Sequence, residues 1–119
     1  MRREILFLAG VLLLVAAGCT KYEIPAPELP EGIPTGVSYS ADVQPIFDAK
    51  CVSCHGGATS PDLTLDWSYD ELIDGDYVNT DDPLESSLYQ IFLGTHDGRA
   101  TEEEVLTILG WIVEGAEDN

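Results

Sequence analysis

Cys51-Val52-Ser53-Cys54-His55 is the stretch of sequence on which the expected fold depends. Two thiols separated by two residues and followed at once by an imidazole are typical of covalent haem c attachment. In such a site the cysteines form thioethers with the vinyl groups and the histidine ligates the iron. The motif therefore predicts one covalent haem c, held by Cys51 and Cys54, with His55 as the proximal iron ligand.

Three other interpretations compete with haem attachment: a thioredoxin-like redox pair, half of a zinc site, and a chance match. A thioredoxin-like pair should follow a strand and open a helix in a βαβ chain, and the sequence has no such pattern. A tetrahedral zinc site needs four ligands, and the only other cysteine and histidine are Cys19 and His96. The histidine directly after the second cysteine favours haem.

The N-terminus has the pattern of a bacterial lipoprotein signal. Met1-Arg2-Arg3 precedes a short apolar run that ends in Val15-Ala16-Ala17-Gly18-Cys19. This ending resembles a lipobox, although Ala16 stands where the family usually has leucine. The sequence predicts a signal peptide over residues 1–18 and lipid attachment at Cys19. An ordinary cleaved signal, or an uncleaved anchor, is the alternative.

The three cysteines are then all accounted for, because Cys19 takes lipid and the other two take haem. A diacylglyceryl group plus an acyl chain would anchor the protein stably, since each buried methylene contributes about 0.8 kcal/mol.

Export agrees with the motif, since haem c is attached outside the cytoplasm. The expected location is the cell envelope of a Gram-negative bacterium. The periplasmic or surface face of the outer membrane is favoured, because Thr20 and Lys21 carry no obvious inner-membrane retention signal.

Acidic residues dominate the charge. The chain has 22 aspartates and glutamates against 5 lysines and arginines, and loss of Arg2, Arg3 and Glu4 with the signal leaves 21 against 3, a net charge of −18. Such a surface repels nucleic acid and anionic headgroups. It favours a partner with a basic docking face and an association that weakens in salt. Solubility, or life in a salty medium, explains the charge equally well.

Residues 19–38 are predicted to form a disordered, lipidated tether ahead of a domain over residues 39–119. Such a composition favours an extended, semi-stiff chain that buries no core. The tether carries four prolines among acidic and small residues: Pro25, Pro27, Pro30 and Pro34. Its expected role is to lift the domain away from the membrane.

Helical periodicity and capping residues predict four helices in the domain. Asp42 is the expected N-cap of the first, because it brings Pro45 into the first turn. Ser68 and Thr101 open capping boxes for the second and the last. The expected ranges are 42–50, 68–75, 82–94 and 101–115.

An acidic loop separates the second and third of these helices. Several of its side chains are those that calcium sites use: Asp74, Asp76, Asn79, Asp81 and Asp82. Their spacing does not match the EF-hand loop and lacks its bidentate glutamate. A solvated acidic loop is therefore the preferred interpretation.

Four stretches of the domain carry a family likeness. They are Val43-Gln44-Pro45-Ile46-Phe47, Cys51-Val52-Ser53-Cys54-His55-Gly56-Gly57, Asp82-Pro83-Leu84-Glu85-Ser86-Ser87-Leu88-Tyr89, and the segment from Glu103-Glu104-Val105 to Trp111-Ile112-Val113-Glu114-Gly115-Ala116. Together they resemble the planctomycete-type cytochrome c domains, monohaem domains that also occur in Bacteroidetes lipoproteins. The resemblance covers residues 39–116. It implies an all-α, small class I cytochrome c-like helical domain wrapped around one covalent haem.

The sequence departs from this family at the sixth iron ligand. Such domains usually place a Met-Pro-Pro segment between the last two helices, whereas here the connection is Gly94-Thr95-His96-Asp97-Gly98-Arg99-Ala100 and the only methionine is Met1. His96 is the natural substitute, because it lies in the loop that faces the iron in the family. Asp97 is a candidate acceptor for its ring nitrogen. The alternative is an exposed, incidental histidine.

Ligation by His96 decides the expected function. With two imidazoles on the iron, the reduction potential falls below that of a Met/His cytochrome, and the protein transfers electrons between extracytoplasmic redox partners. With an open sixth site, a gas or peroxide sensor or a peroxidase-like protein is the alternative, and Arg99 becomes a polar distal group. Arg99 can instead pair with Glu102 and Glu103.

No catalytic residue is predicted, because no Ser, Cys or carboxylate constellation is arranged for substrate turnover. An electron carrier is therefore expected rather than an enzyme. The folded part has only about 80 residues, a marginal size for a hydrophobic core, so the haem is expected to be structural as well as functional.

Overall fold

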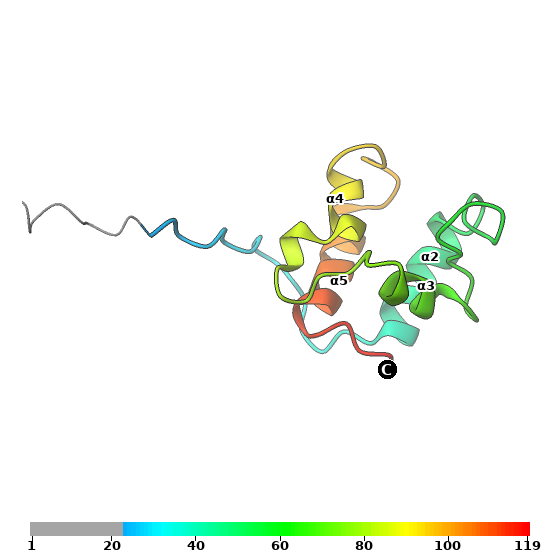
Figure 1. Cartoon of the computed structure of the whole chain (residues 1–119), viewed down its shortest axis with the longest axis horizontal. Coiled ribbons are helices and arrows are strands. Elements are labelled where there is room, and N and C mark those ends of the chain that lie inside the picture. Colours follow the sequence, from blue (N-terminus) through cyan, green and yellow to red (C-terminus); the bar gives the residue numbers. More distant parts are fainter. Residues whose placement is uncertain (1–22) are drawn as a thin grey trace, which may run out of the picture.

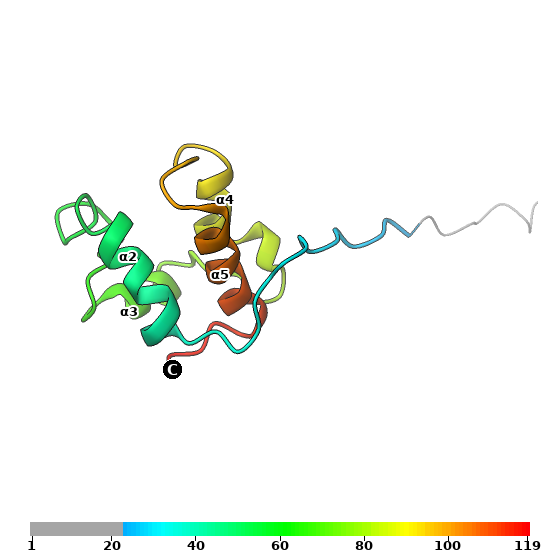
Figure 2. The ribbon, with the colours of Figure 1, turned by 180° about the vertical axis from the view of Figure 1, so that it is seen from behind.

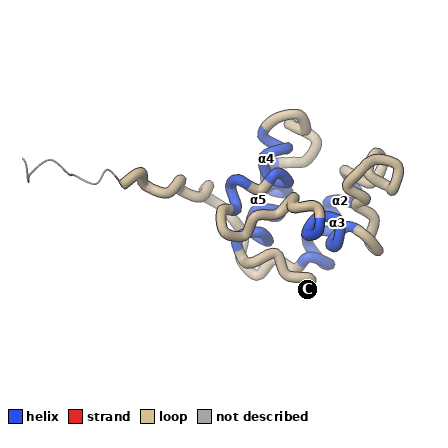
Figure 3. Tube along the Cα trace, in the orientation of Figure 1, coloured by secondary structure: helices blue, strands red, loops and turns tan. Residues whose placement is uncertain are grey.

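The computed structural model describes residues 23–119, and every regular element in this part of the chain is helical (Figure 1 and Figure 3). The elements are a π-helical turn η1 (Tyr39–Val43), α2 (Gln44–Lys50), α3 (Ser68–Asp74), a 3₁₀ turn η2 (Pro83–Glu85), α4 (Ser87–Leu93) and α5 (Glu102–Val113). The expected all-α class is confirmed at this level. The signal peptide over residues 1–18 and the lipid attachment at Cys19 lie outside the described residues.

One core joins these elements. Helix α5 contacts η1, η2 and α4, and α2 continues directly from η1. Figure 2 shows α4 and α5 on one side of the domain and α2 and α3 on the other. An aromatic cluster links the two sides, since the Tyr39 ring lies 4.9 Å from that of Trp111, 5.2 Å from that of Tyr69 and 6.4 Å from that of Phe47. No helix within residues 23–119 has the length and apolar character that a membrane crossing needs.

The first helical segment begins at Tyr39, earlier than the expected start after Asp42. Ser38 is the N-cap, because its hydroxyl accepts the N–H of Ala41 at 3.2 Å. The Asp42 carboxylate accepts the Ser38 N–H at 2.8 Å instead, as the reciprocal half of the cap. Pro45 still falls in the first turn of α2, where its missing N–H costs nothing.

Ser68 is buried and does not cap α3. Its hydroxyl accepts a hydrogen bond from the Tyr39 hydroxyl at 2.7 Å and donates one to the Gln44 side-chain oxygen. Gln44 in turn donates to the Leu63 carbonyl at 3.1 Å. Burial raises the pKa of Tyr39 to about 12. Trp67 consequently occupies the N-cap position without a side-chain cap, and this network fixes the chain just before α3.

The third expected helix is divided by Ser86. Pro83 opens η2 as expected, but Ser86 has extended backbone and is buried, and α4 begins only at Ser87. The Ser86 hydroxyl accepts the N–H of Asn79 at 2.8 Å, which ties the break to the acidic loop. The Asn79 side-chain oxygen accepts the N–H groups of Asp81 and Asp82 at 3.1 and 3.0 Å, so it folds the loop on itself.

Helix α5 has the capping box that the sequence predicts. The Thr101 hydroxyl accepts the Glu104 N–H at 3.2 Å, and the Glu104 carboxylate accepts the Thr101 N–H at 2.7 Å. That backbone bond and the Lys50 ammonium, 3.7 Å away, lower the pKa of Glu104. The start of α5 is thereby tied to the end of α2, next to Cys51.

The last part of the expected tether packs against α5. Residues 33–37, the strap, cross the helix at Gly110, where a Cβ would lie 2.7 Å from the Pro34 carbonyl oxygen. The Glu114 carboxylate accepts the N–H groups of Gly36 at 2.7 Å and Val37 at 2.9 Å, and these bonds lower its pKa. The ordered chain therefore begins before residue 39, where the domain was expected to start.

Replacing Gly110 by alanine is expected to destabilise the domain by displacing the strap. Overpacking costs about 1–3 kcal/mol, whereas alanine gains about 1 kcal/mol over glycine within a helix. Because the obstructing atom belongs to the backbone and cannot rotate aside, the cost should lie in the upper part of that range, and we expect a net loss of about 1–2 kcal/mol in the free energy of unfolding, measured by denaturant titration. Glu103→Ala, at an exposed site on the same helix, should change it by less than about 0.5 kcal/mol. A Gly110→Ala protein as stable as the wild type would contradict the packing of the strap.

Candidate functional site

A largely apolar cleft of about 320 Å³ lies between the chain that follows α2 and helix α4. This volume is within the range of about 300–1,000 Å³ that is usual for small-molecule and cofactor sites. Three of the cleft residues carry the chemistry of the predicted haem site, namely Cys51, His55 and His96. Its apolar walls include Phe47, Leu63, Leu72, Leu88, Ile91 and Phe92.

The 51–55 motif forms a turn that continues from α2. The Cys51 N–H donates to the Phe47 carbonyl at 2.8 Å, and the His55 N–H donates to the Cys51 carbonyl at 2.9 Å. Cys51 is half-buried and lines the cleft, whereas Cys54 is exposed. Burial, with the charge of Glu104, raises the pKa of the Cys51 thiol. The turn thus places one thiol and the imidazole in the cleft, with the second thiol in solvent.

The His55 ring is oriented by two backbone carbonyls. Its Nδ1 lies 3.1 Å from the Pro61 oxygen and 3.2 Å from the Thr59 oxygen. Carbonyl oxygens only accept hydrogen bonds, so Nδ1 carries the proton and Nε2 keeps its lone pair. Metal-ligating histidines have this arrangement, which fixes the tautomer and the ring. Sequence reasoning did not identify these two carbonyls, because backbone oxygen atoms leave no signal in the side-chain pattern.

His96 lies opposite His55. The two ring centres are 6.2 Å apart, with 42° between the ring planes. The turn after α4 places His96 there, because its N–H donates to the Ile91 carbonyl at 2.9 Å. Its Nδ1 lies 3.2 Å from the Thr95 hydroxyl. The hydrogen-bond partner of this ring is therefore Thr95 and not Asp97, which was the candidate acceptor.

The separation of the two rings fits one metal ion between them. A bond from a metal to an imidazole nitrogen is about 2.0–2.1 Å long. The ring centre lies about 1.1 Å behind the nitrogen, so two imidazoles on opposite sides of one metal have centres about 6 Å apart. The free Nε2 of His55 and the apolar walls of the cleft are also what a ligated macrocycle requires. The residues present therefore fit a haem iron held by His55 and His96.

The other candidate residues lie outside this pair. Arg99 is exposed, and between described residues the one ion pair joins Lys50 to Glu104, so Arg99 does not pair with Glu102 or Glu103. Within residues 23–119, no three His, Cys, Asp or Glu side chains gather into a metal-binding group. The two histidines are thus a facing pair rather than part of a larger ligand cluster.

The site is defined by the chain's own residues: the 51–55 motif, the apolar cleft, and the facing imidazoles of His55 and His96. The resemblance to planctomycete-type cytochrome c domains stays a prediction. Comparison with known proteins gave no match to a family model, a curated protein or a solved structure.

Proposed function

We propose that the protein is a membrane-anchored, extracytoplasmic monohaem c-type cytochrome that transfers electrons between redox partners. The observation that carries the proposal is the pair His55 and His96, whose ring centres are 6.2 Å apart across an apolar cleft bordered by Cys51. Cys51 and Cys54 would hold the haem covalently, and the two histidines would ligate its iron. The bound haem supplies a one-electron couple between ferric and ferrous iron.

The chain's own residues favour electron transfer over catalysis. The Pro61 and Thr59 carbonyls hold His55 with Nε2 directed away from them. As the second iron ligand, His96 would occupy the position that a gas or peroxide would need in the alternative sensor or peroxidase-like protein. Arg99, the polar distal group of that alternative, is exposed. Two fixed imidazoles and apolar walls suit a cofactor that changes charge without binding a substrate.

The direction of the tether agrees with an anchored carrier. Figure 1 and Figure 2 show residues 23–32 leaving the domain on the side opposite to the loop that follows α2. A lipid anchor at Cys19 would therefore leave this loop, and the cleft that it borders, facing away from the membrane. Redox partners in the cell envelope would have access to that face.

Expression of the full chain in a bacterium that attaches haem c tests the proposal. We expect the purified protein to keep haem on a denaturing gel, to have a low-spin ferric spectrum without the charge-transfer band of Met-ligated haem, and to be reduced and reoxidised reversibly. Protein that carries no covalent haem would end the proposal. A high-spin ferric spectrum would instead support the gas- or peroxide-binding alternative.

A further inference from the structure

Two large apolar side chains are presented to solvent beside the cleft. Leu65 is 69% exposed and Trp67 is 60% exposed, although both lie in the folded domain. They stand between Leu63 and Ser68, which are both buried. Tryptophan is highly buried on average in folded proteins, and it is enriched among the residues that contribute most to binding at the centres of protein interfaces.

The loop that carries Leu65 and Trp67 is held in place from both ends. The Asp62 carboxylate accepts the N–H of Thr64 at 3.0 Å and its hydroxyl at 2.7 Å. The Thr64 carbonyl then accepts the N–H groups of Trp67 at 3.0 Å and Ser68 at 2.8 Å. The two exposed side chains are therefore displayed on a preformed turn, and binding through them would lose little backbone entropy.

This turn is connected directly to the haem site. The Leu63 N–H donates to the carbonyl of His55 at 2.8 Å, and the Leu63 side chain lines the cleft. Leu65 and Trp67 follow within four residues. A protein bound to them would lie close to the edge of the cleft that the 51–55 motif borders.

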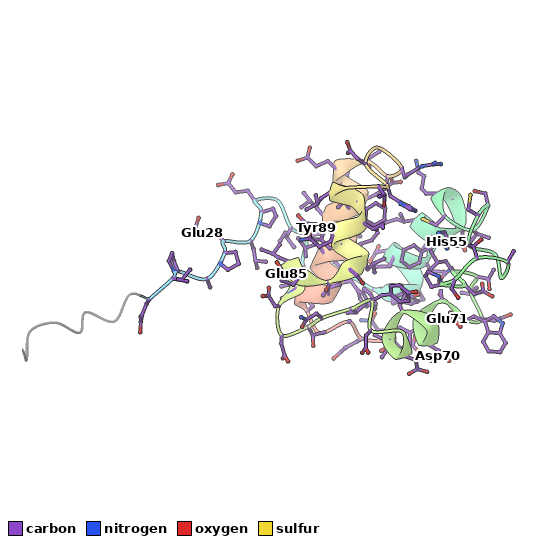
Figure 4. The ribbon with its side chains drawn as sticks, turned by 45° about the horizontal axis from the view of Figure 1, so that its top comes forward. Glu28, His55, Asp70, Glu71, Glu85 and Tyr89 are labelled. Carbon is purple, nitrogen blue, oxygen red and sulfur yellow. The ribbon has the colours of Figure 1, made fainter. Side chains whose placement is uncertain are left out.

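The charge around this surface determines the kind of partner. Between Lys50 and Arg99 the chain has ten aspartates and glutamates and no lysine or arginine. Asp66 and Asp70 are exposed next to the two apolar side chains, and the hydrogen bonds from Thr64 lower the pKa of Asp62. In Figure 4, Asp70 and Glu71 lie on the same side of the molecule as His55, away from Glu28 of the tether. The same field repels anionic lipid and a second copy of this face.

We propose that Leu65 and Trp67 form a docking patch for a redox protein that has an apolar recess rimmed by lysines or arginines. The apolar side chains would enter the recess and supply the short-range contact. The surrounding carboxylates would meet the basic rim and accelerate the encounter. This inference rests on the proposed electron-transfer function, because it names the partner class of that same site.

The test uses the full-length holoprotein and two oxidants in stopped-flow measurements. One is a small cytochrome c whose exposed haem edge is ringed by lysines, and the other is the small complex hexaammineruthenium(III). We expect Trp67→Ser and Leu65→Ser each to slow oxidation by the protein about five- to tenfold, as loss of an interface anchor does. Oxidation by the small complex should stay within about twofold of wild type, since the haem site is unchanged.

Leu93→Ser is the matched control, because Leu93 is an exposed leucine (59%) at the end of α4, the helix that forms the other wall of the cleft. It should leave both rates unchanged. Unchanged rates with the protein oxidant in both patch variants would overturn the docking patch. An equal slowing by Leu93→Ser, or Trp67-dependent dimerisation in sedimentation, would overturn it as well.

Failure of the docking patch is distinguishable from failure of the proposed function. A chain without covalent haem, or a haem that the small complex cannot oxidise, would contradict electron transfer itself. A haem that the small complex oxidises, in variants as fast as wild type with the protein oxidant, would contradict only the docking patch. Because the replaced side chains are largely solvent-exposed, each variant is expected to fold. Circular dichroism and the haem absorption spectrum check this.

Discussion

Replacement of both Cys51 and Cys54 by serine is expected to abolish covalent haem and to leave the chain largely unfolded. Serine cannot form the thioethers. Without the haem, the cleft walls at Phe47, Leu72 and Phe92 would border water. A folded part of about 80 residues has a marginal core, and a group bound only to the folded state stabilises it by mass action. Haem staining of a denaturing gel and far-ultraviolet circular dichroism measure the two effects.

Ser53→Ala is the control for this experiment, because Ser53 is an exposed residue within the same turn. It should keep both the haem and the helical spectrum. Covalent haem in the double serine variant would show that the 51–55 motif is not the attachment site. A haem-free variant with the wild-type helical spectrum would agree with Cys51 and Cys54 as the attachment site, but it would contradict the structural role of the haem.

The sequence predicted helices well where local chemistry alone determines their ends. Thr101 and Glu104 cap each other within one turn, and α4 ends at Leu93 and α5 at Val113, close to the expected ends at residues 94 and 115. Each of these signals involves neighbours in the chain, so periodicity and capping rules find them. Ser38, rather than Asp42, is the cap of the first segment because the π-helical turn starts the helix earlier.

Two serines whose hydrogen-bond partners lie outside their own helices were predicted incorrectly. Ser68 matches the capping-box pattern, yet its hydroxyl is taken by Tyr39 and Gln44, which come from the first helical segment. Ser86 matches a helix interior, yet it bonds Asn79 and breaks the helix. A buried hydroxyl needs a partner, and the partner that tertiary packing offers overrides local preference.

The position of the strap, residues 33–37, also depends on contacts between distant parts of the chain, which local sequence rules do not predict. Proline and acidic residues predicted a chain without a core, but residues 33–37 lie on α5 because Gly110 lets the backbone approach and Glu114 accepts two of its N–H groups. Helical periodicity treats Gly110 only as a weak helix former. It gives no indication that a distant segment crosses the helix at that residue.

The candidate site could be predicted as a set of residues but not as an arrangement. Cys51, Cys54 and His55 follow from spacing, and His96 follows because it is the only other histidine. Whether His96 lies opposite His55 depends on how the turn after α4 folds against the Ile91 carbonyl. The carbonyls of Thr59 and Pro61 carry no side-chain signal, so only the fold brings them to Nδ1 of His55.

Replacement of His96 is expected to change the spin state and the reduction potential of the holoprotein. His96→Ala removes the imidazole whose ring centre lies 6.2 Å from that of His55. With one ligand lost, the ferric iron should change from low-spin to high-spin, which electron paramagnetic resonance detects. His96→Met should restore a low-spin iron and raise the potential by on the order of 0.1 V, within the range of about 0.8 V that axial ligands span.

Asp97→Ala tests whether this effect belongs to the ring rather than to the loop. Asp97 is exposed and adjacent to His96, so its removal should leave the spin state unchanged and move the potential only slightly. A wild-type protein that is already high-spin, and that His96→Ala does not change, would contradict ligation by His96. In that case the sixth position would be open, and the gas- or peroxide-binding alternative would replace electron transfer. A low-spin wild type and a high-spin alanine variant would together identify His96 as the ligand that takes the place of methionine.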